Sequence, residues 1–264
     1  MWNQVLAIPL PIAIAGGDYY DASTWLYANA RGGIVSGGNT GSITSYGYSR
    51  NIHGDVMIES TTGLPIIEQV FRVHGNRTPD FTLGTTNRLR YKNWNLNFLW
   101  DLRVGGDIFN GTNMYLTING RSEKTADRLT PRVVQGVLND GLQNTANPTR
   151  NTILVTPYYN YLYYATTAMP EEDYIERDIN ALRLRDVTLS YTFPAATIKK
   201  IVKGFQSLSM FATGNDMLLF TNYSGADPAT NGGNASLKGV GAVGFDYGNI
   251  APPLSFNFGL RAGF

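Results

Sequence analysis

The stretch Leu254–Phe264, LSFNFGLRAGF, decides the fold class of this chain. Its apolar residues recur at every second position, and small or polar residues lie between them. Such a strand turns one face to an apolar medium and the other to water, and at a tilt of about 40° it crosses about 25 Å. That is the apolar height of an outer-membrane barrel. The edge of a soluble sandwich usually carries more charge than Arg261 alone supplies, so the stretch predicts a transmembrane β-strand.

Two further alternating stretches predict a β-hairpin. Apolar residues occupy mainly odd positions in residues 81–91 and even positions in residues 94–104. Only Lys92 and Asn93 separate the two stretches, which is the tight turn that outer-membrane barrels form on their periplasmic side. A soluble hairpin has the same pattern, but Trp94 on the outward face favours contact with lipid and its interface.

The region that follows predicts another pair of strands. Residues 174–193 are expected to form one long strand. Near Asp186 its apolar residues change from even to odd positions, which indicates a bulge or the point where the strand leaves the bilayer. Ile198–Phe205 predicts a short basic helix or turn, in which the lysines face solvent. Ser207–Phe220 predicts the returning strand.

Long segments alternate with these short turns. Residues 105–152 and 221–253 are rich in Asn, Gly, Thr and Asp, and we expect them to be extracellular loops. Residues 1–50 receive no firm assignment. Their longest apolar run, Val5–Ala15, is too short for a transmembrane helix and lacks the basic flank of a secretory signal.

The composition agrees with a membrane barrel. Hydrophobic residues make up 43% of the chain and charged residues 16%, against about 25% charged residues in soluble domains. The net charge of +1 gives no basic footprint for nucleic acid. The sequence contains no cysteine, which excludes disulfides and thiolate metal sites. These features leave transport and binding as the function classes to consider.

The sequence offers no convincing catalytic or metal constellation. His53 and His74 lack the spacing of metal ligands, and we expect both to be structural or loop residues. Adjacent acids in Glu171–Asp173 are predicted to be a solvated strand entrance rather than the carboxylate pair of a glycosidase. The glycines at positions 239, 241 and 244 lie outside any βαβ unit and predict a flexible loop.

Asp107, Asn110 and Asn113 offer oxygens for calcium, but their spacing matches no established calcium loop. We therefore predict neither a metal nor a cofactor, and we expect a protein that is not an enzyme.

At the level of motifs, the chain resembles a known family. GNRTPDFTLGTTNRLRYKNWNLNFLWDLRVGGDIFNGTN (Gly75–Asn113) is similar to the barrel hairpin of SusC/RagA-type TonB-dependent outer-membrane transporters. Further motifs follow in the order of that family: Thr130–Gly141, Glu171–Pro194, Phe211–Pro228 and Asp246–Phe264. The resemblance covers about residues 50–264.

The resemblance implies an all-β fold, an antiparallel transmembrane β-barrel of which this chain is the C-terminal portion. Barrels of this family have 22 strands and a plug. No plug domain or TonB box precedes the motifs, so residues 1–264 are expected to be part of a single barrel domain, which is either continued in a longer polypeptide or completed by another chain. The length also allows a self-contained barrel of eight strands, but the family motifs disfavour it. By the same resemblance, Phe264 corresponds to the terminal aromatic residue that the barrel-assembly machinery recognises.

The function implied by the resemblance is TonB-dependent import of a large nutrient across the outer membrane. The implied partners are a SusD-like surface lipoprotein, the TonB-ExbB-ExbD complex, and the lipid bilayer with its lipopolysaccharide; nucleic acid is not among them. A different class stays open, namely a secreted all-β carbohydrate-binding or adhesion module whose strands pack two sheets together. Such a module would be soluble without detergent.

Hydroxyl-rich ligands suit polar loops with aromatic stacking surfaces, so an oligosaccharide is the preferred ligand and a peptide the second choice. The segment YYNYLYY (residues 158–164) is interpreted first as an aromatic girdle and second as a stacking surface for sugar rings. The candidate ligand-binding residues are Asn110, Asn113, Tyr115, Tyr158, Tyr159, Tyr161, Asn222, Tyr223 and Asp227.

Overall fold

A computed structural model describes residues 12–14, 17–21, 30–34, 38–201, 204–229 and 243–263. The chain divides into two compact units. Unit 1 comprises residues 1–78, 106–177 and 229–249, and unit 2 comprises residues 79–105, 178–228 and 250–264. Among the described residues, no helix combines the length and the apolar composition that crossing a membrane requires. The candidate assembly residue Phe264 lies outside the described residues, as do the glycines at 239 and 241.

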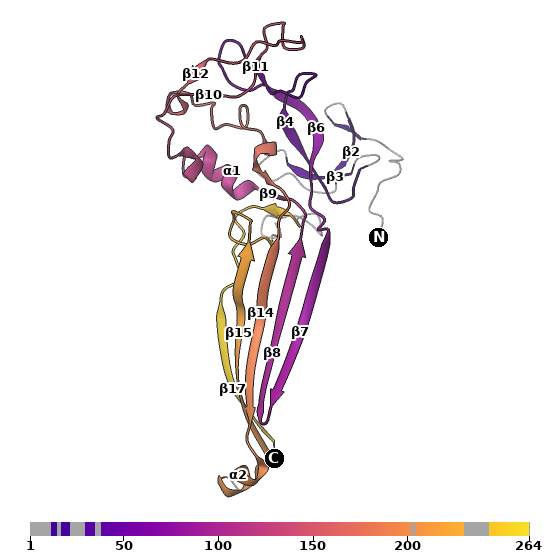
Figure 1. Cartoon of the computed structure of the whole chain (residues 1–264), viewed down its shortest axis with the longest axis vertical. Coiled ribbons are helices and arrows are strands. Elements are labelled where there is room, and N and C mark those ends of the chain that lie inside the picture. The colour runs from indigo at the N-terminus through magenta and orange to yellow at the C-terminus, as the bar shows by residue number, and fades with distance from the viewer. Residues whose placement is uncertain are drawn as a thin grey trace. The chain divides into compact units, whose positions relative to one another are not determined.

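Unit 2 is built on one antiparallel sheet of five long strands, which lie side by side in Figure 1. Their order across the sheet is β17-β15-β14-β8-β7. Their bounds are Phe81–Tyr91 for β7, Trp94–Val104 for β8, Ala181–Thr192 for β14, Ser207–Thr221 for β15 and Ser255–Gly263 for β17. The helix α2, Ala195–Ile201, lies between β14 and β15 in the sequence. It begins three residues before the predicted basic helix or turn, Ile198–Phe205, and overlaps it at residues 198–201.

The hairpin of β7 and β8 confirms the prediction from alternation. Phe81 pairs with Val104 at one end and Tyr91 with Trp94 at the other, with an unbroken register between them. Lys92 adopts a positive φ of 52°, the left-handed conformation that a two-residue hairpin turn requires. Period-two sequences with a two-residue connection leave only one register open, which is why the boundaries could be predicted to the residue.

The change of apolar parity in β14 is caused by a bulge. The register shifts between Leu184 and Asp186 in the pairing of β14 with both of its neighbours. Before the shift Leu184 pairs with Trp100, and after it Val187 pairs with Phe98. Because Trp100 and Phe98 share a face of β8, the extra residue returns the apolar side chains of β14 to one face. The predicted bulge is therefore confirmed.

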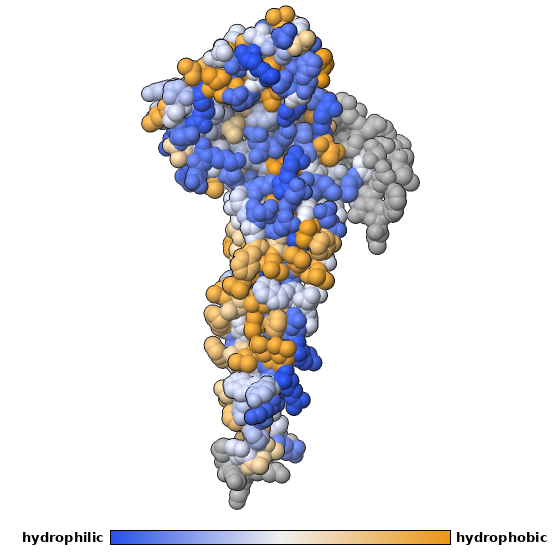
Figure 2. All heavy atoms as spheres, viewed as in Figure 1, coloured by the Kyte–Doolittle hydropathy of each residue, from blue (hydrophilic) through white to orange (hydrophobic). Residues whose placement is uncertain are grey.

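One face of this sheet is apolar and exposed. Phe258 and Leu260 of β17 have 79% and 74% of their surface exposed, and Phe81, Leu83 and Leu89 of β7 are exposed too. Figure 2 shows apolar side chains gathered over these strands. Since each of these side chains stands at an alternate position, the exposed apolar surface follows directly from the sequence pattern.

The other face of the sheet is largely polar and hydrogen-bonded. The Nε of Arg88 donates to Oδ1 of Asn97 over 3.0 Å, and the hydroxyls of Thr188 and Thr213 lie 2.8 Å apart. A Cβ added to Gly259 would meet the Phe211 ring at 2.4 Å, so the ring packs closely over this glycine. The two faces of the sheet thus differ in polarity, as expected for barrel strands with one face toward lipid and the other toward a polar interior.

The expected long strand of residues 174–193 is wrong in its first part. Glu171–Tyr174 forms the 3-10 helix η3, Ile175–Glu176 forms the short strand β13, and only Ala181–Thr192 forms the long strand β14. Asp178 has a positive φ of 52°, which ends regular extension between β13 and β14. β13 belongs to unit 1 and β14 to unit 2.

Unit 1 contains a second sheet of five strands in the order β1-β2-β3-β4-β6. The strands are β1 (Ile12–Ile14), β2 (Gly17–Asp21), β3 (Arg31–Ile34), β4 (Ser42–Tyr48) and β6 (Ile67–Asn76). The described parts of residues 1–50, which the sequence left unassigned, therefore contribute strands to unit 1.

Short elements organise the segments that were expected to be loops. Small sheets pair β13 with β9 and β9 with β16, β11 with β5, and β10 with β12. The short strands are β5 (Met57–Ile58), β9 (Ile108–Asn110), β10 (Arg132–Val133), β11 (Val137–Leu138), β12 (Leu154–Val155) and β16 (Phe245–Asp246). The helices of unit 1 other than η3 are α1 (Gly111–Ile118), η1 (Glu123–Thr125) and η2 (Pro157–Tyr159).

The largest described apolar cluster of unit 1 collects side chains that are far apart in the sequence. It consists of Ala30, Ile43, Phe109, Met114, Tyr174, Ile175, Phe245 and Tyr247. Burial of such side chains provides the main favourable free energy of folding. This cluster holds α1 and the segment around β16 together, and it thereby positions the pocket described below.

Candidate functional site

The candidate site is built around the helix α1. Asn110 caps this helix: its Oδ1 accepts a hydrogen bond of 2.8 Å from the backbone N of Asn113. The Nδ2 of Asn110 donates to Oε1 of Glu176 over 2.7 Å. The helix buries Gly111, Met114 and Thr117 and exposes apolar side chains on its other side. A group of exposed apolar residues can form a contact surface for a ligand or a partner.

Gly111 lets the start of α1 lie against the ring of Tyr247. A Cβ at this position would meet ring atoms of Tyr247 at 2.7 Å and the carbonyl oxygen of Asp246 at 2.8 Å. The hydroxyl of Thr112 donates to Oδ1 of Asp246 over 2.6 Å and accepts from the backbone N of Gly248 over 2.7 Å. These contacts join the helix to the segment that follows β16, although more than a hundred residues separate them in sequence.

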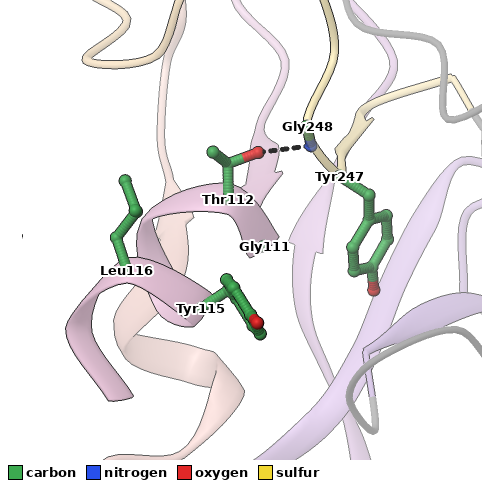
Figure 3. A pocket seen from close by; sticks show the side chains of 6 residues that line it. All are labelled: Gly111, Thr112, Tyr115, Leu116, Tyr247 and Gly248. Atoms are coloured by element: carbon green, nitrogen blue, oxygen red, sulfur yellow. Dashed lines mark hydrogen bonds between the residues drawn. The ribbon is translucent and has the colours of Figure 1, made fainter. Parts of the chain in front are cut away.

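A pocket of about 360 Å³ opens between the helix and this segment. Figure 3 shows the hydrogen bond between Thr112 and Gly248 on one side and the rings of Tyr115 and Tyr247 beside it. Tyr115 is 59% exposed, whereas Tyr247 is mostly buried. Because the Thr112 hydroxyl is already engaged with Asp246 and Gly248, the pocket offers mainly aromatic and apolar walls. Such walls suit the flat face of a ring or an apolar side chain.

The predicted residues of α1 divide into two groups. Asn110 and Asn113 support the helix, because Asn110 caps it and Oδ1 of Asn113 accepts a hydrogen bond of 2.9 Å from the hydroxyl of Ser122. Tyr115 lines the pocket. Tyr115 is thus the one candidate residue that lines the pocket, and its contact with a ligand stays a prediction. The sequence did not single out the other lining residues: Gly111, Thr112, Leu116, Tyr247 and Gly248. Tyr247 carried no local signal beyond its place in the family motif Asp246–Phe264.

The tyrosines of residues 158–164 do not lie on strands. Tyr158 and Tyr159 belong to the 3-10 helix η2, and Tyr161 lies in the turn after it. The preferred interpretation as an aromatic girdle is therefore not supported, because a girdle is formed at the ends of membrane-spanning strands. Tyr159 and Tyr161 are 80% and 88% exposed, and Tyr158 is exposed as well. Exposed rings agree with the second interpretation, a stacking surface.

The three candidates in unit 2 are engaged inside the chain. Asn222 accepts a hydrogen bond of 2.7 Å from the backbone N of Asn180, and Tyr223 and Asp227 are buried. The guanidinium of Arg183 donates to both carboxylate oxygens of Asp227. These contacts give the three residues a structural role, and contact with a ligand stays a prediction for them.

The acidic segment Glu171–Asp173 is not a solvated strand entrance. It forms η3, where Glu171 is fully buried and the hydroxyl of Tyr48 donates to Oδ2 of Asp173. Burial is the main cause that raises the pKa of Asp173 and also the pKa of Tyr48, and it raises the pKa of Tyr174 to about 12. The expectation failed because tertiary packing covers the segment.

His74 belongs to the same buried cluster. Its Nδ1 lies 2.9 Å from the hydroxyl oxygen of Ser45, and its Nε2 lies 3.9 Å from Oε2 of Glu172. Burial lowers the pKa of His74, and the neighbouring carboxylate of Glu172 opposes that shift. Ser45 itself is fully buried. A serine hydroxyl that is buried in this way is not accessible to a substrate. The arrangement therefore gives His74 the structural role that was predicted.

A lowered pKa of His74 has a predictable effect on stability. Below the ordinary value of 6.5 the unfolded chain binds the proton more readily than the native chain. The contribution of His74 to the free energy of unfolding is therefore lost as the pH falls from about 6.5 through the lowered pKa. We expect His74→Gln to flatten this part of the stability profile, measured as the unfolding temperature of the purified protein at several pH values.

His53→Gln is the matched control, because the His53 ring is held at the surface by the carbonyl of Thr145 at 3.0 Å. A profile that His74→Gln does not alter would contradict the prediction.

The residues considered for calcium are engaged elsewhere. Oδ2 of Asp107 accepts a hydrogen bond of 2.7 Å from the backbone N of Asn76, and Asn110 and Asn113 hold the contacts given above. Within the part of the chain that the structure describes, no three His, Cys, Asp or Glu side chains are grouped as metal ligands.

The curated proteins to which the chain is similar share one description, TonB-dependent receptor. No protein-family model matches the chain. The chain is 30% identical over 195 residues to TonB-dependent receptor P3 of Formosa agariphila, covering 73% of this chain and 17% of the relative. It is 27% identical over 206 residues to TonB-dependent receptor P26 of the same organism, covering 73% and 18%. It thus spans less than a fifth of the length of these curated relatives.

Among solved structures, the chain is similar to the RagAB peptide transporter, with 15% identity, a TM-score of 0.44, and coverage of 77% of this chain and 22% of that one. The curated relatives are all named as TonB-dependent receptors. Their similarity extends over most of the region in which the motifs occur. The chain is thus similar to one part of the TonB-dependent receptors.

Proposed function

We propose that this chain is part of an outer-membrane receptor that imports a large nutrient, with energy delivered through TonB. In this proposal the sheet of unit 2 is part of the wall of a 22-stranded barrel, and unit 1 carries extracellular loops of the same barrel domain. The location is the outer membrane, in contact with the bilayer and its lipopolysaccharide. A SusD-like surface lipoprotein and the TonB-ExbB-ExbD complex are the partners.

The observation that carries the proposal is the exposed apolar face of the five-stranded sheet. Leu89 and Tyr91 at one edge and Phe258 and Leu260 at the other are all well exposed. A soluble protein rarely exposes an apolar surface that extends across a whole sheet. The alternative, a secreted module with two packed sheets, requires a second sheet over this face, whereas the apolar side chains named above are exposed.

The ligand site of the proposal is the pocket of Tyr115 and Tyr247, with the exposed tyrosines of residues 158–161 as a further stacking surface. An oligosaccharide is the first choice of ligand, because aromatic faces stack on sugar rings while loop amides and carboxylates pair with hydroxyls. A peptide is the second choice, since the apolar walls of the pocket also accept an apolar side chain.

The test of the proposed site is Tyr115→Ala in the complete receptor. Loss of one aromatic stacking partner is expected to weaken ligand binding about tenfold. Labelled oligosaccharides and labelled oligopeptides are offered separately to outer-membrane vesicles that contain the receptor, and equilibrium binding is measured. Whichever class binds identifies the ligand.

Ile118→Ala is the matched control, because Ile118 is an exposed apolar residue of the same helix that does not line the pocket. It should leave the affinity unchanged. Equal affinities in the two variants would remove the pocket from the ligand site. Binding of neither class, together with recovery of the protein in the soluble fraction, would contradict the proposed function itself.

A further inference from the structure

A groove of about 480 Å³ lies on the apolar face of the sheet in unit 2. On this face, Ala212 has the smallest side chain among the residues that line the groove. Larger side chains surround it: Trp94, Leu189, Tyr191, Met210, Phe258 and Leu260. The groove belongs to the half of the sheet that ends at the turn Lys92–Asn93, because Trp94 begins β8 and Tyr191 lies near the end of β14.

The register of the strands explains why the surface is hollow there. Ala212 pairs with Leu189 on one side and with Phe258 on the other, so a methyl group stands between two large side chains. In the adjoining row, Tyr191 and Met210 pair side by side. The groove crosses four neighbouring strands, which is about 14 Å at the usual strand spacing. Its length therefore matches an extended hydrocarbon chain rather than a single side chain.

The chemistry of the lining selects the ligand. The side chains around the groove are aliphatic or aromatic, so a sugar or a peptide backbone placed there would lose its hydrogen bonds to water without replacing them. A hydrocarbon chain forms no hydrogen bonds to water and therefore loses none when it enters the groove. Each methylene buried against such a surface contributes favourably to binding.

Groups suited to a lipid headgroup lie at the turn end of the groove. The rings of Trp94 and Tyr191 are 4.8 Å apart, and both side chains combine an apolar body with a hydrogen-bond donor. The Nζ of Lys92 lies 5.3 Å from the centre of the Tyr91 ring, and Tyr91 pairs with Trp94. An ammonium group beside interfacial aromatic rings attracts phosphate.

We propose that this groove binds one acyl chain of a glycerophospholipid whose phosphate lies near Lys92. The inference rests on the proposed function, because the apolar face has to border a bilayer. Tight turns of outer-membrane barrels face the periplasm, so the lipid comes from the periplasmic leaflet, where phospholipids and not lipopolysaccharide are found. The aromatic pair and the charge distinguish this site from the rest of the apolar face.

The experiment uses the complete receptor reconstituted in vesicles that contain a phospholipid with a photoreactive group in one acyl chain. After illumination, the crosslinked residues are mapped by mass spectrometry. We expect crosslinks to concentrate at the groove, above all at Met210, Ala212 and Phe258. Ala212→Leu fills the hollow and should reduce them about tenfold, the factor that corresponds to about two displaced methylene groups.

Ala262→Leu is the matched control, because Ala262 is an exposed residue at an even position of β17 outside the groove. It should leave the crosslinks at the groove unchanged. Lys92→Asn removes the charge with a residue that tolerates the left-handed turn conformation, and it should lower the yield about fivefold.

Three results would overturn the inference, and they separate it from the proposed function. Crosslinks spread evenly over β7, β8 and β17, with no difference between the two alanine variants, would mean ordinary annular lipid. Preferential displacement of the probe by lipopolysaccharide would assign the groove to the other leaflet. Absence of crosslinks from the whole face would contradict the membrane location on which the proposed function depends.

Discussion

Replacement of Asp227 by asparagine is expected to lower the free energy of unfolding of the receptor by about 3–5 kcal/mol. Asp227 and Arg183 form an ion pair in which the two side chains are only 6% and 7% exposed. Loss of the carboxylate leaves a buried guanidinium with incomplete compensation, and desolvation then dominates the result. Urea unfolding of the receptor in lipid vesicles measures the change.

The geometry around Arg183 explains why the effect should be large. Arg183 donates to both oxygens of Asp227 and, over 3.0 Å, to Oδ1 of Asp216. Arg103 donates over 3.2 Å to the carbonyl of Pro228, the residue after Asp227. Two arginines of neighbouring strands thus hold the segment that follows β15. We expect Asp227→Asn to increase proteolytic cleavage in this segment as well.

Asp101→Asn is the matched control. Its partner Arg185 lies on the same sheet, but the two side chains are 34% and 46% exposed, so solvent screens the pair and the loss should stay below about 1 kcal/mol. Replacement of both buried partners, Arg183→Met with Asp227→Leu, should recover much of the stability, because apolar groups need no compensation. Equal losses for Asp227→Asn and Asp101→Asn would show that burial does not govern the contribution of these pairs.

Phe98→Arg is expected to lower the free energy of unfolding of the receptor in a bilayer by about 2–4 kcal/mol, whereas Leu99→Arg is expected to have little effect. Phe98 and Leu99 are neighbours on β8 but point to opposite faces of the sheet. Phe98 pairs with Val187 on the apolar face. Leu99 pairs with Asp186, whose carboxylate favours a cation.

The comparison tests the membrane-facing assignment directly. Both variants are unfolded by urea in vesicles of the same lipid, and their unfolding free energies are compared with that of the unchanged receptor. The two positions have similar depth along the strand, so bilayer depth does not separate them. Similar losses at positions 98 and 99 would contradict the view that one face borders lipid, and would favour a sheet covered by protein on both sides.

The parts of the fold that the sequence predicted are those governed by local chemistry. β7 and β8 begin and end where the alternation predicted, because two residues that can form a tight turn leave a single register. The bulge near Asp186 was also predictable, since a change of apolar parity within a strand requires an extra residue if one face is to stay apolar. A short helix or turn between β14 and β15 was predicted as well, although α2 begins at Ala195 rather than Ile198.

The parts that the sequence missed depend on contacts between distant segments. Residues 174–180 alternate like a strand, yet the positive φ of Asp178 interrupts them. The sequence predicts that the acidic residues of η3 are solvated, but other residues of unit 1 pack against this segment and Glu171 is buried. The structural roles of Asn222, Tyr223 and Asp227, which follow from their hydrogen bonds and burial, had no local signal in the sequence, and their contact with a ligand stays a prediction. In each case tertiary packing outweighed the local preference.

By itself, the sequence determined the amphipathic strands, the tight turn, the bulge and the resemblance to SusC/RagA-type receptors, because period-two alternation and turn chemistry act between neighbouring residues. Only the tertiary structure decided which residues meet. It placed Tyr247 beside Tyr115, paired Arg183 with Asp227, and opened a groove over Ala212. These arrangements depend on packing and register between segments far apart in the chain, for which no local pattern carries a signal.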